Sequence, residues 1–166
     1  IHIDIDPSSI NKTVNVDVGI IGDVSHVLGD MIKIWERSKN RCDEKAIKSW
    51  WKIINRWRER KSLSYDKSSK LIKPQYAIER LYELTKTNSE VYITTEVGQH
   101  QMWAAQHYHF EQPNRWMTSG GLGTMGYGLP AAIGVQLAHP KALVIDIAGE
   151  ASILMNMQEM STLVQH

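Results

Sequence analysis

A glycine-rich segment, Ser119–Gly128, is the most suggestive stretch for ligand binding. It holds five glycines in ten residues, and glycine lets the backbone adopt positive φ angles and approach a ligand closely. We expect a helix directly after it, whose first free N–H groups could face an anion or a polar ring. The spacing Gly121-x-Gly123-x-x-Gly126 also matches the dinucleotide fingerprint, with Asp146 at the distance of a ribose-binding carboxylate. A purely structural tight turn explains the loop equally well.

The dinucleotide interpretation of this loop has a weakness. The fingerprint should follow a buried strand, and Asn114–Thr118 is a poor strand sequence. A nicotinamide-binding domain is therefore the weaker alternative for this half of the chain.

A second candidate segment, Val144–Ser152, has the sequence of a strand that ends in a small-residue turn. Such a strand delivers side chains to the carboxyl edge of a sheet, where open α/β proteins bind ligands. The Glu150 carboxylate could hold Mg²⁺ there, and a helix expected from Ser152 onward could accept a phosphate group. The alternative is that Glu150 is only a first-turn helix residue favoured by the helix dipole.

A third strand-to-helix turn lies at Glu96–Gln101, with polar side chains around Gly98. A histidine such as His100 is, taken alone, more often a packing or surface residue than a ligand. Three such strand ends in succession, each with a glycine and a helix start, are harder to explain separately. One phosphate-bearing cofactor lying across all of them would account for the three together.

The elements around these turns predict a parallel α/β sheet with flanking helices. Pro74 suits the first turn of a helix, and Val91–Thr95 is a short run of β-branched and aromatic residues typical of a strand. Ala142–Ile147 resembles a second, buried strand, and Pro130–Ala138 a helix of small residues. Lys61–Lys73 is polar and serine-rich, so we expect a linker there. After it we expect the order helix, strand, helix, glycine-rich loop, helix, strand, helix.

Residues 1–60 predict a further α/β segment. Ile1–Asp6 and Val14–Val18 alternate apolar and polar residues as strands do, and the second run leads into Ile20. Val24–Trp35 has helical spacing, and Asp43 is placed to cap another helix with tryptophans on one face and basic residues on the other. Tryptophans beside basic residues suggest RNA binding. Because the whole chain is nearly neutral, we favour the alternative that the basic face is exposed to solvent and the tryptophans form a packing stripe on the other face.

The composition is that of an ordinary soluble protein, with 42% hydrophobic and 22% charged residues among 166. A net charge of +1 gives no sign of a nucleic-acid or membrane partner. The single cysteine, Cys42, cannot form an internal disulfide, and no apolar run reaches the ~18 residues of a membrane helix, so we expect a cytoplasmic protein. Because the chain opens inside a strand pattern and closes inside a helix pattern, we expect an excerpt of a longer protein.

The segment Thr94–Gln165 closely resembles the large, catalytic subunits of the acetolactate synthase family, which depend on thiamine diphosphate. The match runs from Thr-Thr-Glu-Val-Gly-Gln-His-Gln-Met-Trp through Thr-Ser-Gly-Gly-Leu-Gly-Thr-Met-Gly-Tyr-Gly to Met-Asn-Met-Gln-Glu-Met. The opening Ile-His-Ile-Asp-Ile-Asp-Pro-Ser-Ser resembles the end of that family's central FAD-binding domain, and Pro-Gln-Tyr-Ala-Ile-Glu-Arg-Leu-Tyr the start of its third domain. The similarity is weakest in the lysine-rich stretch 40–70.

This resemblance implies a division of the chain into three segments. Residues 1–60 would be the C-terminal part of a Rossmann-like FAD-binding domain, residues 61–73 a linker, and residues 74–166 the N-terminal half of a thiamine-diphosphate-binding domain. The implied fold class is α/β, a parallel sheet with flanking helices that forms an incomplete thiamine-diphosphate-binding fold.

The resemblance also implies a role for individual residues. Glu150 stands at the Mg²⁺-ligand position, where the family normally has aspartate. The implied diphosphate contacts are Gly98, Gln99, His100, Ala151 and Ser152. The implied aminopyrimidine contacts are Gly123 and Met125, with Val97 nearby. The implied FAD contacts are Asp4, Ile5, Asp23 and Val24. Because glutamate is one methylene longer than aspartate and Mg²⁺ demands near-ideal octahedral geometry, we expect weaker metal binding.

The implied activity is the decarboxylative condensation of pyruvate with a second 2-keto acid, pyruvate or 2-ketobutyrate, in the biosynthesis of branched-chain amino acids. Thiamine diphosphate and Mg²⁺ would serve the reaction, and FAD would be structural. The family implies a homodimer or tetramer of catalytic subunits with a small regulatory subunit, and its activating glutamate lies in another domain. We therefore expect no catalytic residue in this stretch and no turnover by it alone. The alternatives are a pyruvate oxidase or glyoxylate carboligase type of enzyme, or an inactive remnant.

Overall fold

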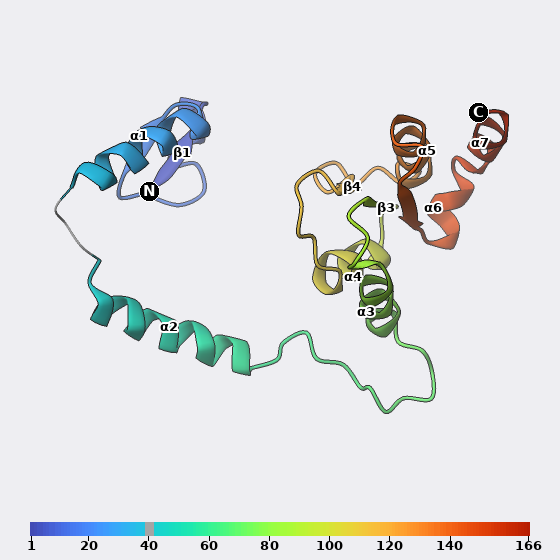
Figure 1. The fold of residues 1–166 in the computed structure, drawn as a ribbon, viewed down its shortest axis with the longest axis horizontal. Coiled ribbons are helices and arrows are strands. Elements are labelled where there is room, and N and C mark those ends of the chain that lie inside the picture. Colours follow the sequence, from blue (N-terminus) through green and yellow to red (C-terminus); the bar gives the residue numbers. More distant parts are fainter. Residues whose placement is uncertain (39–41) are drawn as a thin grey trace. The chain divides into compact units, whose positions relative to one another are not determined.

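The computed structural model describes residues 1–38 and 42–166. The chain forms two compact units, Ile1–Arg60 and Lys61–His166, both drawn in Figure 1. The predicted segment 1–60 includes residues 39–41, which lie outside the described residues. The assignment of the predicted segments to domains of a larger enzyme stays a prediction.

The first unit contains a two-stranded parallel sheet. β1 (His2–Asp4) pairs with β2 (Gly19–Ile21), in a register that sets Asp4 opposite Ile21. A short 3-10 turn, η1 (Pro7–Ser9), follows β1. The alternating pattern at the start of the chain is thus confirmed as a strand, although a shorter one than expected.

The predicted strand at Val14–Val18 is wrong. Asn11 adopts a positive φ of 62°, and its side-chain oxygen accepts the Val16 N–H at 2.9 Å. This local bond forms a loop, because a side-chain acceptor replaces the ladder partner that a strand residue needs. Ladder pairing with β1 begins only at Val18, whose carbonyl accepts the His2 N–H.

The two helices of the first unit are both confirmed. α1 spans Val24–Arg37 and α2 spans Glu44–Glu59. Each begins after an aspartate, Asp23 or Asp43, whose carboxylate accepts two backbone N–H groups of the first turn. Such caps satisfy N–H groups that have no partner within a helix, which is why aspartate is favoured there.

The second unit is built on a three-stranded, wholly parallel sheet in the order β4-β3-β5. The strands are β3 (Val91–Thr95), β4 (Trp116–Thr118) and β5 (Leu143–Ile147). The predicted α/β class with a parallel sheet and flanking helices is confirmed. Asn114–Thr118, which has a poor sequence for a buried strand, contributes a three-residue, half-buried edge strand, because Trp116–Thr118 pair with the central strand β3.

Helices cover both faces of this sheet. α3 (Pro74–Thr85) and α4 (Gln99–His107) lie together in Figure 1, and Ile78 of α3 joins Val91 and Ile93 of β3 in the apolar core. The next residue along the strand, Thr94, points to the opposite face, because successive side chains of a strand alternate. That opposite face is covered by α5 (Gly128–Ala138), which contacts all three strands.

The last part of the chain differs from the single helix expected from Ser152 onward. It consists of α6 (Glu150–Leu154), the 3-10 turn η2 (Met157–Glu159) and α7 (Met160–Gln165). The break falls at Asn156, whose φ of −132° and ψ of 23° are not helical. Its side chain instead donates to the backbone carbonyl of Gly126 at 2.6 Å.

The predicted linker, residues 61–73, contains no helix or strand but is held to the second unit. The Tyr65 hydroxyl donates to the Glu79 carboxylate of α3 at 2.6 Å, and the Lys67 ammonium lies 3.4 Å from it. The buried His107 of α4 lies 3.4 Å from the other Glu79 oxygen. Among the described residues, no helix has the combination of length and apolar character needed to span a membrane.

Candidate cofactor site at the carboxyl edge of the sheet

The three predicted turns lie side by side at one edge of the sheet. Because the strands are parallel and Thr95 pairs with both Thr118 and Ile147, the chain leaves β3, β4 and β5 at the same level. The turns surround a hollow of about 410 Å³. Its lining comprises Val97, Gly98, Gln99, His100, Trp103, Met125, Ala148, Gly149, Glu150, Ala151 and Ser152. The structure thus brings together the residues predicted from two of the turns and Met125 of the third.

His100 joins two of these turns. Its imidazole lies against Gly98 after β3 and Gly149 after β5: a Cβ at Gly98 would come within 2.8 Å of the ring, and one at Gly149 within 2.9 Å. Both positions therefore need glycine for the ring to occupy its place. The Nε2 atom of His100 is buried and has no hydrogen-bond partner within the described residues. A buried polar atom left unpaired at the wall of a hollow is suited to a ligand oxygen.

The glycine-rich loop supplies the third wall. Met125 is 38% exposed and faces the hollow. Gly123 has a φ of 72°, and a Cβ there would lie 3.9 Å from the Val97 side chain, so the loop and the end of β3 are close together. Val97 and the loop residues Gly123 and Met125 thus lie near one another, and their contact with one ligand ring stays a prediction.

The dinucleotide interpretation does not fit this geometry. In that motif the third glycine belongs to the start of the helix, where it allows close packing on the strand. Here Gly126 precedes the first residue of α5, Gly128. Asp146, the expected ribose partner, accepts the Thr94 hydroxyl at 2.9 Å on the α5 side of the sheet. Its carboxylate lies against Gly128, where an added Cβ would meet Oδ1 at 2.5 Å, rather than at the hollow.

The environment of Asp146 is unusual for a carboxylate. Burial raises the pKa of Asp146 to about 6; the neighbouring Glu96 carboxylate also raises it, and the Thr94 hydroxyl opposes the shift. One oxygen, Oδ2, is buried without a hydrogen-bond partner among the described residues. A carboxyl group in this setting retains a proton at higher pH than an exposed one.

Glu96 was not singled out from the sequence, but its side chain hydrogen-bonds to the glycine-rich loop and to the start of α5. Its side chain is completely buried, with 0% exposure. One carboxylate oxygen accepts the Gly126 N–H at 2.7 Å and the other accepts the Leu129 N–H at 3.0 Å. The available signal was its type: an acidic residue directly after a run of strand residues, where burial requires hydrogen-bond partners.

The predicted metal ligand, Glu150, is the first residue of α6 and is exposed at the rim of the hollow. Ala151 is also exposed, whereas Ser152 is 2% exposed and its hydroxyl donates to the Gly149 carbonyl at 3.2 Å. The described residues contain no cluster of three or more histidine, cysteine, aspartate or glutamate side chains suited to a metal ion. Of the residues that line the hollow, Glu150 is the acidic one, and carboxylate oxygen is a ligand that Mg²⁺ prefers.

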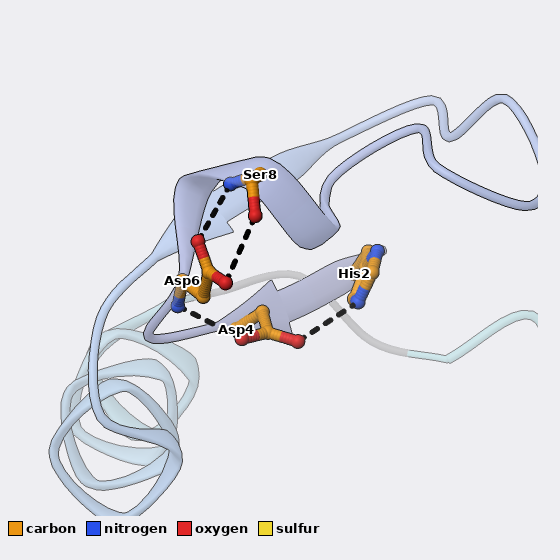
Figure 2. A network of polar contacts seen from close by, with 4 residues as sticks. All are labelled: His2, Asp4, Asp6 and Ser8. Atoms are coloured by element: carbon orange, nitrogen blue, oxygen red, sulfur yellow. Dashed lines mark hydrogen bonds and ion pairs between the residues drawn. The ribbon is translucent and has the colours of Figure 1, made fainter.

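The residues predicted for FAD lie at the carboxyl ends of β1 and β2, within the first unit. Figure 2 shows the Asp4 carboxylate, which accepts the Asp6 N–H at 2.9 Å and lies 3.6 Å from His2. The Asp6 carboxylate accepts both the N–H and the hydroxyl of Ser8, which lowers the pKa of Asp6.

The second strand end of this unit lies close to the first. The Gly22 N–H donates to the Asp4 carbonyl at 2.9 Å, so Asp4 and Ile5 on one side and Asp23 and Val24 on the other meet at one edge. Asp23 serves as the cap of α1 through one oxygen and keeps 48% of its side chain exposed. The arrangement leaves carboxylate oxygen accessible to a hydroxyl donor.

Sequence comparison with known proteins covers the three turns around the hollow. Residues 96–166 match the family of the thiamine pyrophosphate enzyme C-terminal TPP binding domain. Over 166 residues the chain is 52% identical to the acetolactate synthase large subunit of Buchnera aphidicola subsp. Schizaphis graminum, and 49% identical to the acetolactate synthase isozyme 3 large subunit of Escherichia coli K12. It covers 28% and 29% of these two proteins. Over 165 residues, 98% of the chain, it is 45% identical to chloroplastic acetolactate synthase of Arabidopsis thaliana, of which it covers 24%.

The three turns around the hollow lie within residues 96–166, the stretch that matches the thiamine pyrophosphate enzyme C-terminal TPP binding domain. More particularly, the chain is a homologue, along its whole length, of acetolactate synthase large subunits. The family resemblance seen in the sequence is confirmed. The chain spans less than a third of the length of these relatives.

Proposed function

We propose that the protein containing this chain is an acetolactate synthase catalytic subunit, which condenses pyruvate with a second 2-keto acid after decarboxylation. The observation that carries the proposal is the hollow bounded by the turns after β3, β4 and β5, which are also the segments with the family motifs. The chemistry available from bound thiamine diphosphate is stabilisation of a carbanion at the former keto carbon.

The diphosphate of the cofactor would lie between the β3 and β5 turns. Gly98, Gln99 and His100 would contact it from one side, and Ala151 and Ser152 from the other. Two observations support a diphosphate at this place: the Nε2 atom of His100 has no hydrogen-bond partner among the described residues, and Gly98 and Gly149 leave room for the His100 ring between the two turns. Protonated at Nε2, the imidazole would donate to a phosphate oxygen.

The aminopyrimidine ring of the cofactor would lie against the glycine-rich loop. Gly123 leaves room beside Val97, and Met125 supplies an apolar surface at the hollow. A thioether side chain is flexible and polarizable, so it can support a ring without competing for its hydrogen bonds. These residues would fix the cofactor in a bent conformation and exclude water from one side of it.

The Mg²⁺ ion would be held by Glu150 together with diphosphate oxygens. Glu150 is exposed at the first position of α6, so its longer side chain must fold back toward the hollow to reach the position that aspartate occupies in the family. Mg²⁺ accepts little departure from octahedral geometry at about 2.0–2.1 Å. Weaker metal affinity than in the aspartate-containing relatives is the expected consequence.

Residues 1–60 would contribute to an FAD-binding domain. Asp4, Ile5, Asp23 and Val24 would contact the adenosine end, with carboxylate oxygen accepting from ribose hydroxyls. FAD would have a structural role. The complete protein would be cytoplasmic and would form a homodimer or tetramer with a small regulatory subunit, and pyruvate and 2-ketobutyrate would be its substrates.

Calorimetric titration of the full-length protein with thiamine diphosphate, with and without Mg²⁺, tests the proposal. Saturable, metal-dependent binding that is weakened by His100→Ala and unchanged by His109→Ala supports the site, because His109 does not line the hollow. Pyruvate supplied to the same protein should give the condensation product; oxygen consumption instead would indicate the pyruvate oxidase type. Absence of cofactor binding would indicate the inactive remnant, for which the Glu150 substitution is the specific reason.

A further inference from the structure

Gly126 is held from two sides by residues that have no assigned role. Its N–H donates to the completely buried Glu96 carboxylate at 2.7 Å, and its carbonyl accepts from the Asn156 side chain at 2.6 Å. Glu96 directly follows β3, and Asn156 lies just beyond α6, the helix that begins with Glu150. Both backbone groups of one loop residue are thus tied to the other two turns around the hollow.

The surroundings leave Gly126 no freedom to be another residue. It has a φ of 88°, and a Cβ there would come within 2.7 Å of the Asn156 amide nitrogen and 3.1 Å of the Met155 Cβ. The second oxygen of Glu96 accepts the Leu129 N–H at 3.0 Å, so the same carboxylate also fixes the first turn of α5. The loop is therefore fixed immediately after Met125.

The break between α6 and η2 falls at the residue that makes this contact. Asn156 leaves the helical conformation, and α6 ends at Leu154, where an uninterrupted helix would otherwise continue. A buried carboxylate that accepts two backbone N–H groups is fully satisfied, whereas removal of either acceptor would leave a buried donor unpaired.

We propose that Glu96 and Asn156 are positioning residues that clamp Gly126 and so set the position of Met125 relative to the turn that carries Glu150. This inference deepens the proposed function and rests on it for its consequence in cofactor binding. Neither residue lines the hollow. The clamp fixes the glycine-rich loop relative to the turn that carries Glu150. Loosening it therefore disturbs both the site of the aminopyrimidine ring and the site of the diphosphate.

The first test needs no cofactor. Hydrogen exchange of the full-length protein, followed by mass spectrometry, reports on the segment 119–128. Asn156→Ala removes one of two hydrogen bonds and should speed exchange there about tenfold, the effect of losing one buried bond. Glu96→Gln keeps the side-chain size but replaces one acceptor by a donor, and should do the same. Ser161→Ala removes a hydrogen bond to Gln158 on the same segment and should leave the loop unchanged.

The second test uses the bound cofactor. Asn156→Ala should weaken thiamine diphosphate binding about tenfold and change the near-ultraviolet circular dichroism of the bound cofactor at saturation, because the loop no longer orients the ring. Ser161→Ala should match the unaltered protein in both measurements. Asn156→Gln should not restore the signal, since its longer side chain does not fit beside Gly126.

The outcomes separate the two proposals. Unchanged exchange in the loop of both Asn156→Ala and Glu96→Gln would overturn the clamp. A wild-type cofactor spectrum and affinity in Asn156→Ala would overturn its positioning role. Faster exchange in a protein that binds no thiamine diphosphate would uphold the clamp as a structural element but refute the proposed function and the positioning role that depends on it. Faster exchange together with an altered cofactor spectrum supports both.

Discussion

Replacement of Gly128 by alanine should destabilise the second unit strongly, although alanine is the better helix former. A Cβ at this first residue of α5 would lie 2.5 Å from Asp146 Oδ1, 2.7 Å from the Glu96 nitrogen and 2.8 Å from the Thr95 carbonyl carbon. Two of these three atoms belong to the backbone of the β3 end, which cannot move aside as a flexible side chain would. Overpacking in a core costs about 1–3 kcal/mol, and contacts with backbone place this substitution at about 3 kcal/mol or more.

The matched control is Gly134→Ala in the same helix. No atom lies within 4 Å of a Cβ at Gly134, which is exposed near the middle of α5. Alanine there should stabilise the protein by about 0.5–1 kcal/mol, because it reduces the backbone entropy lost on folding. One substitution type in one helix is thus expected to give free energies of opposite sign.

Urea unfolding of the full-length protein, monitored by pulse proteolysis and fragment identification, measures both variants. Gly128→Ala should move the transition of fragments from residues 74–166 to clearly lower urea, and Gly134→Ala to slightly higher urea. Equal behaviour of the two variants would refute the close approach of α5 to the end of β3. It would also remove the physical reason for glycine at this position.

Three further perturbations test the site. Glu150→Asp should raise Mg²⁺ affinity about tenfold by restoring the shorter reach; titration of the metal at saturating cofactor measures this, and an unchanged affinity would contradict the geometric argument. His100→Ala should weaken thiamine diphosphate binding by a factor of about 5–150, the worth of one buried polar contact at 1–3 kcal/mol, with no binding change for His109→Ala. Burial raises the pKa of Asp146 from 3.8 to about 6, so the folded state holds more protons than the unfolded state between these values, and stability falls as pH rises through that window. Asp146→Asn should therefore stabilise the protein more at pH 7.5 than at pH 5 in thermal unfolding; an equal gain at both values would show that the carboxyl titrates normally.

The sequence predicted those elements whose local chemistry and packing agree. Val91–Thr95 is a strand in the structure with the predicted bounds, because a run of β-branched and aromatic residues also supplies the centre of the sheet. Asp43 and Pro74 mark predicted helix starts, because the Asp43 carboxylate satisfies free N–H groups of the first turn and Pro74 has no N–H group to satisfy. The grouping of Val97, Gly98, Gln99 and His100 with the Glu150 turn follows from parallel strand topology.

The elements that were missed depend on contacts distant in the sequence. β4 is only three residues long and is stabilised by pairing with β3 rather than by its own sequence. The break at Asn156 arises from a hydrogen bond to Gly126, thirty residues away along the chain. Glu96 likewise finds its partners in the glycine-rich loop. The hydrophobic periodicity of a short segment does not reveal hydrogen-bond or strand partners that are distant in the sequence.

The positions of the glycine-rich loop differ in how well they tolerate amino-acid substitution during evolution. Its glycines are not equivalent: a side chain at Gly121 would meet no atom within 4 Å, and one at Gly120 would meet only the Thr118 methyl group at 3.9 Å. Leu122 beside them is 91% exposed, whereas Gly126 and Gly128 are closed to any side chain. Natural drift or a directed-evolution library should therefore accumulate diversity at 120–122 while the second half of the loop stays fixed. New specificity could enter through the tip of the loop without loosening its base.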